Sequence, residues 1–225
     1  MTETRGYIFD YGGTLDTGGC HWGKMFWHAY QQAGVPISEP QFREAYVFAE
    51  RTLGSTPVIR PDFTFRQTLE TKLRLQLGAL GLSPMSLLGP IADLLYTSVL
   101  RHTAHSREVL QQMELPKVLV SNFYGNMPTV LQEFGFDGLF QYVVESAVVG
   151  IRKPDPRIFL LGVEALGLQP EEVTVVGDSV AKDIIPAKAA GCQTIWLRGE
   201  QWTDDAVDLS AADRIIDDLS ELITT

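Results

Sequence analysis

The sequence of 225 residues has no long apolar run and few cysteines. No stretch approaches the ~20 consecutive apolar residues that a membrane-spanning helix needs, so we expect no membrane segment. Residues 1–5 lack the basic end and the apolar core of a secretion signal. The two cysteines, Cys20 and Cys192, stand far apart and outside any Cys/His cluster, which disfavours a zinc site. We therefore expect a cytoplasmic protein whose cysteines are reduced.

Basic residues are also scarce. The chain has 18 Lys and Arg against 28 Asp and Glu, which gives a formal net charge of −10. An electrostatic field of this sign repels a nucleic-acid backbone, so we expect no nucleic-acid partner. A small anionic substrate is still compatible with this field, because a divalent cation inverts the charge locally. Neither charge nor composition indicates an oligomeric state.

Six short apolar runs have the length of β-strands, and helical patterns separate most of them. Continuous apolar runs are typical of strands that are buried on both faces of a parallel sheet. The alternation of strand and helix predicts right-handed crossovers between neighbouring strands. We therefore predict the α/β class, a Rossmann-like, doubly wound parallel sheet, with strands at residues 7–9, 117–120, 142–144, 173–176, 193–197 and 214–216.

Residues 17–104 have a different pattern, with three helical stretches and no convincing strand. Ser38-Glu39-Pro40-Gln41 has the form of a capping box at a helix start, and Ser83-Pro84 has the form of an N-cap followed by proline. A segment of this length is compatible with a small domain. We predict an all-helical inserted domain at residues 17–104 and a discontinuous core made of residues 1–16 and 105–225.

Polar residues follow the predicted strands at the edge where parallel sheets bind ligands. Asp10, Ser121 and Asp178 each end a strand, Lys153 stands in a loop, and Asp183 follows Asp178 closely. An aspartate can attack phosphorus, and carboxylate oxygens bind Mg²⁺, which neutralises phosphoryl charge. A hydroxyl and an ammonium can hold the other phosphoryl oxygens. The pattern indicates phosphoryl transfer.

Four segments in this order resemble the motifs of the haloacid dehalogenase-like hydrolase superfamily. One of them alone would be a weak signal, but four with suitable separations over most of the chain are specific, and the helical insert lies where this family places a cap domain. The segments are Phe9-Asp10-Tyr11-Gly12-Gly13-Thr14-Leu15, Val120-Ser121-Asn122, Lys153-Pro154-Asp155-Pro156-Arg157-Ile158-Phe159, and Val176-Gly177-Asp178-Ser179 through Lys182-Asp183.

The resemblance assigns roles to these residues. It implies that Asp10 is the nucleophile, that Lys153 is a further catalytic residue, and that Ser121 and Lys153 hold the phosphoryl group. It also implies Mg²⁺ as cofactor, with a site formed by Asp10, the backbone carbonyl of Gly12, Asp178 and Asp183. Two further residues are candidates for substrate binding. Thr14 hydrogen-bonds near the nucleophile or only completes its turn, and Asn122 positions the substrate or only caps the next helix.

The sequence departs from the family pattern at Gly12. Phosphatases of the family usually carry a second aspartate there, which protonates the leaving group, and glycine keeps only the backbone carbonyl. General acid–base catalysis is worth about 10²–10⁴ in rate, so the loss matters most for a basic leaving group. Another residue can substitute: the candidates are Asp16 and the helix side that carries His21, Lys24 and His28.

Two alternatives to a substitute acid stay open. A phosphonatase-like C–P hydrolase lacks the second aspartate and uses a cap lysine, for which Lys24 and Lys72 are the two candidates in the insert. Alternatively, the protein is catalytically impaired and binds a phosphorylated ligand or a partner. Dehalogenases of the family also lack this aspartate but work without a metal, and the pair Asp178 and Asp183 argues against carbon–halogen cleavage. We expect a Mg²⁺-dependent phosphatase that acts on a small phosphorylated substrate through an aspartyl phosphate on Asp10.

Overall fold

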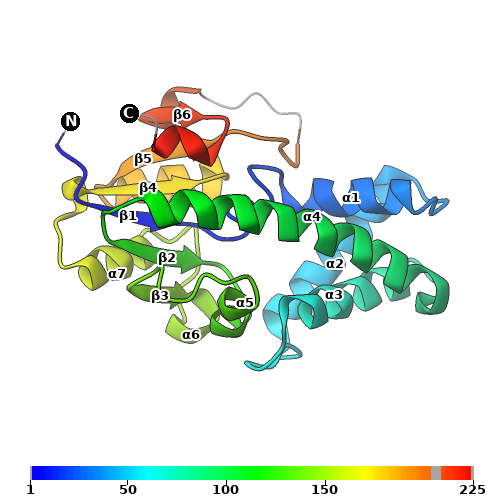
Figure 1. Cartoon of the computed structure of the whole chain (residues 1–225). Coiled ribbons are helices and arrows are strands. Elements are labelled where there is room, and N and C mark those ends of the chain that lie inside the picture. Colours follow the sequence, from blue (N-terminus) through cyan, green and yellow to red (C-terminus); the bar gives the residue numbers. More distant parts are fainter. Residues whose placement is uncertain (1, 204–208, 224–225) are drawn as a thin grey trace.

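The computed structural model describes residues 2–203 and 209–223, and a parallel β-sheet of six strands forms the middle layer of one half of the molecule (Figure 1). The strand order is β3-β2-β1-β4-β5-β6, so the chain starts in the middle of the sheet and builds outward on both sides. All six predicted strands and the predicted fold class are confirmed. The strands are β1 (Gly6–Phe9), β2 (Lys117–Ser121), β3 (Tyr142–Glu145), β4 (Val173–Gly177), β5 (Gln193–Leu197) and β6 (Arg214–Ile216).

Helices cover both faces of the sheet. Side chains alternate between the faces along each strand: in β1, Ile8 packs with α7 (Arg157–Leu166) and α8 (Ile185–Ala189), whereas Phe9 belongs to the apolar cluster of α4 (Pro84–Gln112). The remaining short elements complete the connections between strands. They are α5 (Met127–Glu133), α6 (Ser146–Val149), η1 (Pro170–Glu172), η2 (Val180–Ile184), η3 (Leu209–Ala211) and η4 (Leu219–Leu222).

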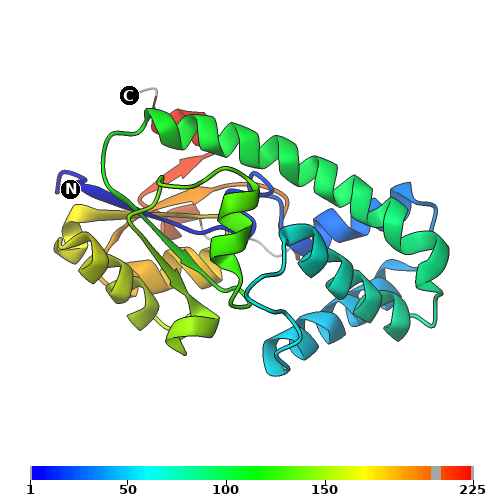
Figure 2. The ribbon, with the colours of Figure 1, turned by 60° about the horizontal axis from the view of Figure 1, so that its bottom comes forward.

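A helical region lies beside the sheet and consists of α1 (Trp22–Gln32), α2 (Glu39–Ser55), α3 (Phe65–Ala79) and the first half of α4. The predicted capping box at Ser38 and Gln41 is present, and Ser83 caps α4 as predicted. The 29 residues of α4 run without interruption past residue 104, from the helical region onto the sheet (Figure 2). The domain boundaries at 16/17 and 104/105 stay a prediction.

One apolar cluster extends from the sheet into the helical region. Leu119 and Val176 of the sheet belong to the same cluster as Phe26 of α1, Leu73 of α3 and Ile91 of α4. The two parts of the molecule therefore share a hydrophobic core, and burial of this shared surface holds the helices against the carboxyl edge of the sheet. None of the described helices is long and apolar enough to cross a membrane.

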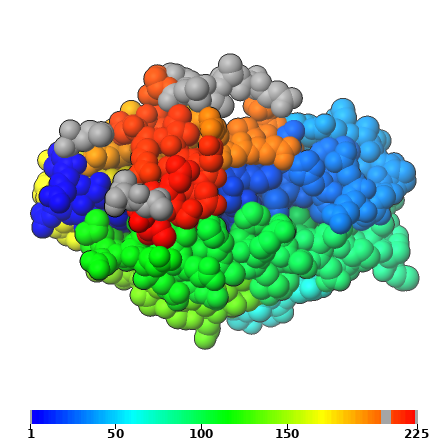
Figure 3. All heavy atoms as spheres, turned by 45° about the horizontal axis from the view of Figure 1, so that its top comes forward, coloured from blue at the N-terminus to red at the C-terminus, as the bar shows by residue number. Residues whose placement is uncertain are grey.

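The segment after β5 makes a second connection to the helical region. The ring of Trp202 packs against Tyr46 of α2 and against His21, with ring centroids 5.0 and 5.3 Å apart. The Arg43 guanidinium lies over the Trp202 ring at 4.2 Å and donates a hydrogen bond of 2.9 Å to the Trp202 carbonyl. Figure 3 shows this segment in orange against the blue helices. We call residues 198–203 the β5 latch.

Candidate active site

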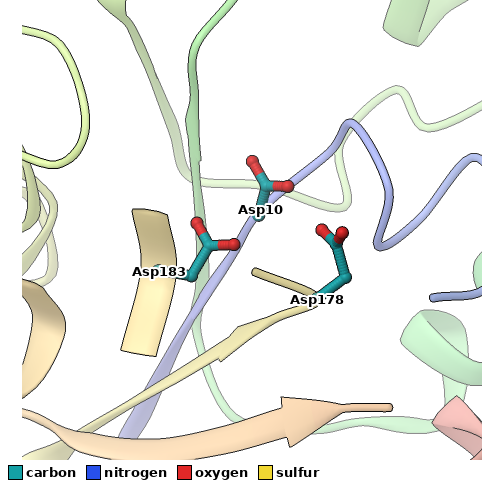
Figure 4. Close-up of side chains that lie close together, drawn as sticks. All are labelled: Asp10, Asp178 and Asp183. Carbon is teal, nitrogen blue, oxygen red and sulfur yellow. The ribbon is translucent and has the colours of Figure 1, made fainter. Parts of the chain in front are cut away.

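Three buried aspartates meet at the carboxyl edge of the sheet (Figure 4). Asp10 directly follows β1, Asp178 directly follows the adjacent strand β4, and Asp183 lies in η2, the single π-type turn that comes next. Each offers a carboxylate oxygen, and these oxygens lie within 4.8 Å of one another. Parallel pairing of β1 with β4 places the two strand ends side by side, and the turn returns Asp183 toward them. The three residues predicted as metal ligands are thus brought together.

Lys153 enters the same cluster from the loop before α7. Its ammonium donates hydrogen bonds to Asp10 Oδ1 at 2.6 Å and to Asp183 Oδ1 at 2.7 Å, and its side chain is 2% exposed. Asn122, just after β2, holds the backbone of Lys153 from both sides: Lys153 N donates to Asn122 Oδ1 at 2.9 Å, and Asn122 Nδ2 donates to Lys153 O at 3.1 Å. Asn122 therefore positions Lys153. Its contact with a substrate stays a prediction.

Asp178 is held in place from two sides. Thr14 Oγ1 donates to Asp178 Oδ1 at 3.1 Å and accepts from Asp178 N at 3.0 Å. The indole N–H of Trp196 in β5 donates to the Asp178 carbonyl at 2.8 Å. Thr14 Oγ1 also lies 3.4 Å from Asp10 Oδ2. Thr14 is fully buried beneath the carboxylates, so in this arrangement it orients two of them.

The electrostatics of the cluster fit a cation. Burial raises the pKa of Asp10 to about 6 although Lys153 opposes the shift, and burial together with Asp183 and Asp10 raises the pKa of Asp178 well above its ordinary value. Three carboxylates face a single ammonium, so ionising all of them leaves an excess of negative charge in a buried place. Hard oxygen donors in such a cluster are the ligands that Mg²⁺ prefers, and a bound divalent ion would compensate this charge.

Gly12 and Gly13 follow Asp10 in the turn after β1, and only at Gly12 is there room for a side chain. A Cβ at Gly12 would stand 3.8 Å from the Trp22 ring, an ordinary contact, so the backbone has room for a side chain there. Gly13 has a φ of +106°, and a Cβ there would collide with the Asp178 carboxylate. Asp16 closes this turn: its oxygens accept from Gly13 N at 2.7 Å and from Trp22 Nε1 at 3.0 Å.

A cavity of about 140 Å³ opens above the aspartates, between the sheet edge and the helical region. Lys153 and the triad form part of its floor. The predicted residues Gly12, Ser121 and Asn122 also line it, and Ser121 is almost fully buried at the end of β2. The helical region supplies its roof through Trp22, Phe26, Tyr46, Glu50, Phe65, Thr68, Leu69 and Lys72.

The candidates for a replacement acid take different positions. Asp16 does not line the cavity, because both of its oxygens are engaged below it. His21 lines the cavity, but it caps α1 instead of lying on its face, with Nδ1 accepting from Gly23 N at 3.0 Å. Burial lowers the pKa of His21 to about 4, so the ring is neutral near pH 7. Lys24 and His28 point to Glu200 of the β5 latch instead.

Three cavity residues had no assigned role or only a weak one in the sequence. Lys72 of α3 was one of two candidate lysines, whereas Glu50 of α2 and Tyr124 after β2 carried no signal. Lys72 Nζ lies 2.6 Å from Glu50 Oε1, and Tyr124 Oη donates to Glu50 Oε2 at 3.1 Å. These residues come from three segments that are distant in sequence. A charged residue within a helix is predicted to be solvent-exposed unless its tertiary partner is known.

A profile of haloacid dehalogenase-like hydrolases matches residues 4–191, which include the triad, Lys153 and the whole helical region. The chain belongs to this family. The resemblance seen in its four motifs is thereby confirmed. As a member of the haloacid dehalogenase-like hydrolases, the protein has the scaffold of a hydrolase, and the nucleophile role of Asp10 stays a prediction.

The relatives include both phosphatases and proteins named only by their family. The chain is 27% identical over 194 residues to mouse haloacid dehalogenase-like hydrolase domain-containing protein 3. The aligned region covers 82% of this chain and 77% of the mouse protein. It is 33% identical over 132 residues to the phosphoglycolate phosphatase of Escherichia coli K12, or 56% of this chain and 50% of that enzyme. The matches to a glyceraldehyde 3-phosphate phosphatase of Pyrococcus furiosus and a phosphoserine phosphatase of Thermus thermophilus span 37% and 23% of the lengths of those proteins, respectively.

Solved structures show the same fold. A dehalogenase captured with an intermediate superposes with a TM-score of 0.66 at 18% identity, covering 99% of this chain and 97% of that one. This likeness concerns the fold, because identity is low. The choice between phosphatase and dehalogenase chemistry therefore depends on the residues of the site itself.

Proposed function

We propose that the protein is a Mg²⁺-dependent phosphatase that hydrolyses a small phosphorylated compound through an aspartyl phosphate on Asp10. The observation that carries the proposal is the buried cluster of Asp10, Asp178 and Asp183 with Lys153 at the end of β1. A family member that cleaves carbon–halogen bonds has no need of a divalent cation, whereas a phosphatase does. The names of several relatives, including a phosphoglycolate and a phosphoserine phosphatase, support a phosphoester substrate.

The chain's own groups divide the work at phosphorus. An Asp10 carboxylate oxygen attacks, the bond from phosphorus to the leaving oxygen breaks, and that oxygen takes up a proton. Water then attacks the phosphorus of the acyl phosphate, which releases inorganic phosphate and restores the carboxylate. In this proposal, Lys153 and Ser121 hold phosphoryl oxygens. Their support is that Lys153 hydrogen-bonds Asp10 at 2.6 Å and that both residues line the cavity.

The proposed metal site consists of Asp10, Asp178, Asp183 and the carbonyl of Gly12. Bound there, Mg²⁺ would supply neutralisation of the phosphoryl charge. Thr14 and Trp196 keep Asp178 at the site through their hydrogen bonds, and Lys153 offsets part of the charge of Asp10 and Asp183. The helical region serves as the cap: it roofs the cavity and restricts the substrate to a small molecule.

Hydrolysis of acetyl phosphate tests the proposal directly, because this substrate has a leaving group that needs no proton. We expect turnover with Mg²⁺, loss of turnover with EDTA and recovery on addition of Mg²⁺. Asp10→Asn should abolish it, since an amide oxygen cannot form the acyl phosphate, while Asp155→Asn, at a partly exposed carboxylate paired with Arg157, should not. Turnover that persists in Asp10→Asn, or in EDTA, would contradict the proposal.

A further inference from the structure

Glu50, Lys72 and Tyr124 form a polar cluster in an otherwise largely aromatic roof. Glu50 Oε1 is 2.6 Å from Lys72 Nζ, and Glu50 Oε2 accepts from Tyr124 at 3.1 Å. The Lys72 ammonium also lies over the rings of Phe26 and Tyr124, at 5.7 and 5.4 Å. The cluster lies on the cavity wall, and it joins α2, α3 and the loop after β2.

Both charges of the pair are retained. Burial alone would raise the pKa of Glu50, but Lys72 and Tyr124 hold it below its ordinary value. Burial alone would lower the pKa of Lys72, but Glu50 raises it well above. The Glu50 side chain lines the cavity and is 31% exposed, whereas its Oε1 atom is buried beside Lys72.

The short ion pair selects among leaving groups by charge. A ligand ammonium that approaches Glu50 is attracted by its carboxylate but repelled by the nearby Lys72 ammonium. A ligand carboxylate that approaches Lys72 is likewise repelled by Glu50, so in both cases the repulsion offsets much of the attraction. A hydroxyl avoids this conflict, because it donates to the carboxylate and accepts from the ammonium. Neighbouring rings such as Phe26 and Phe65 offer apolar surface to C–H groups. The cluster therefore fits an uncharged leaving group with several hydroxyls.

The absence of a side chain at Gly12 restricts the leaving group in a second way, independent of the ion pair. No carboxylic acid stands at this position, Asp16 is engaged below the cavity, and His21 is neutral. With these candidate acids set aside, we take the leaving oxygen to depart with little help from a proton donor. The anomeric oxygen of a sugar is less basic than an ordinary alkoxide, because the ring oxygen withdraws electrons from its carbon. A hydroxylated leaving group of this kind satisfies both restrictions.

We propose that the substrate is a small aldose phosphorylated on its anomeric oxygen, with its hydroxyls bound by Glu50, Lys72 and Tyr124. The inference rests on the proposed phosphatase function and specifies its substrate class. Asp10 forms a bond to phosphorus, the bond from phosphorus to the anomeric oxygen breaks, and this oxygen takes a proton from water. The products are the free aldose and, after hydrolysis of the aspartyl phosphate, inorganic phosphate.

Ribose 1-phosphate and ribose 5-phosphate provide a matched pair, since they differ in the phosphorylated oxygen. We expect the wild-type protein with Mg²⁺ to hydrolyse ribose 1-phosphate with kcat/KM at least tenfold above that for ribose 5-phosphate, phosphoserine and phosphoglycolate. Gly12→Asp should narrow the gap between the two ribose phosphates, because it restores a proton donor. A preference for phosphoserine, phosphoglycolate or ribose 5-phosphate would overturn the inference.

Variants of the cluster test the binding role. Glu50→Gln and Tyr124→Phe should each lower kcat/KM for ribose 1-phosphate, relative to that for acetyl phosphate, about tenfold. Glu50→Gln also leaves the Lys72 charge uncompensated, so it should raise the relative rate for phosphoglycolate. Glu70→Gln, in an exposed ion pair with Arg74 of the same helix, is the matched control and should change neither ratio.

The outcomes separate this inference from the proposed function. Turnover of acetyl phosphate that needs Mg²⁺ and Asp10, combined with unchanged ratios in Glu50→Gln and Tyr124→Phe, would overturn the substrate assignment alone. Absence of acetyl phosphate turnover would instead overturn the phosphatase function on which it rests. Circular dichroism of each variant establishes that a changed ratio does not come from unfolding.

Discussion

Gly12 and Gly13 are adjacent, but only one of them is required by the backbone. Gly13 has a φ of +106°, and a Cβ added there would collide with the Asp178 carboxylate, whereas a Cβ at Gly12 would have space toward Trp22. The loss of the usual acid at Gly12 is thus not enforced by the fold, because a side chain can be accommodated. This is why Gly12→Asp is an informative variant.

The two glycines lead to a matched prediction about stability. Gly13→Ala should destabilise the protein by about 2 kcal/mol or more, because it adds left-handed strain and displaces a buried carboxylate. Gly12→Ala should change the free energy of unfolding by less than about 0.5 kcal/mol, as an ordinary contact requires. Urea unfolding of both variants measures the difference, and equal effects would contradict the assigned geometry.

His21 predicts a pH dependence of stability. Its pKa is lowered by burial to about 4, whereas the unfolded chain takes up this proton near pH 6.5. Below pH 6.5 the unfolded state therefore binds more protons than the folded state, and stability falls as the pH drops from 6.5 to 4. The full effect is at most about 3 kcal/mol.

His21→Asn removes the titrating ring and retains an N-cap acceptor for α1. The slope of unfolding free energy against pH between 4 and 6.5 should decrease in this variant. Urea denaturation at several pH values measures it, with His105→Asn, at an exposed histidine paired with Asp218, as the control. An unchanged slope in His21→Asn would show that His21 does not titrate as the structure requires.

At the scale of single elements, α3 offers a clean comparison. Gly78 lies within the helix with open space around its α-carbon, and Gly81 follows the helix end with a φ of +67°. Gly78→Ala should stabilise the protein by about 0.5–1 kcal/mol through the loss of unfolded-state freedom. Gly81→Ala should destabilise it by about 1 kcal/mol. Thermal unfolding decides both signs, and the same sign for the two would contradict the helix boundary.

Most elements could be predicted because their signals are local. The sheet strands are continuous apolar runs, and Asp10, Ser121 and Asp178 were recognisable because a polar residue ends each run. Helix starts at Ser38 and Ser83 follow from capping chemistry. These patterns depend on neighbours a few residues away, which the sequence displays directly.

Other features depend on tertiary contacts and could not be predicted. The pairing of Glu50 with Lys72 needs the packing of α2 on α3, and Tyr124 joins them from the loop after β2. The helix side with Lys24 and His28 was a candidate for the active site, but Glu200 attracts both of them to the β5 latch. A charge pattern on one helix does not reveal which neighbour it faces.

At the scale of the whole molecule, the shared apolar cluster predicts cooperative unfolding. Residues of the sheet and of α1–α4 bury one another in a single core, so neither part retains its packing when the other unfolds. Fluorine-labelled tryptophan gives separate NMR signals for Trp22 in the helical region and Trp196 in the sheet. Both should lose their native signals at the same urea concentration. Two separated midpoints would show that the regions unfold independently.

The chain crosses between sheet and helical region at two places that differ in stiffness. One is the turn-rich segment of residues 11–21, and the other is the uninterrupted helix α4. In α4, Ile91, Leu95 and Val99 and, further along, Val109 and Leu110 all belong to the shared apolar cluster. Between them Ser106 donates a buried hydrogen bond of 2.8 Å to the Leu15 carbonyl, which ties the two crossings together.

This arrangement limits how the cavity between the sheet and the helical region opens to a ligand. A pair of flexible connections would let the roof swing like a lid on a hinge, but a rigid rod shared by both halves does not allow that motion without bending. The roof can instead pivot or slide slightly about the rod, which requires contacts at its edges to break. These contacts are the β5 latch and the hydrogen bonds of Asn126 to Thr68 and of Tyr96 to Glu133. The exchange of ligands then depends on loosening contacts at the edges of the roof, not on swinging the roof about a flexible joint.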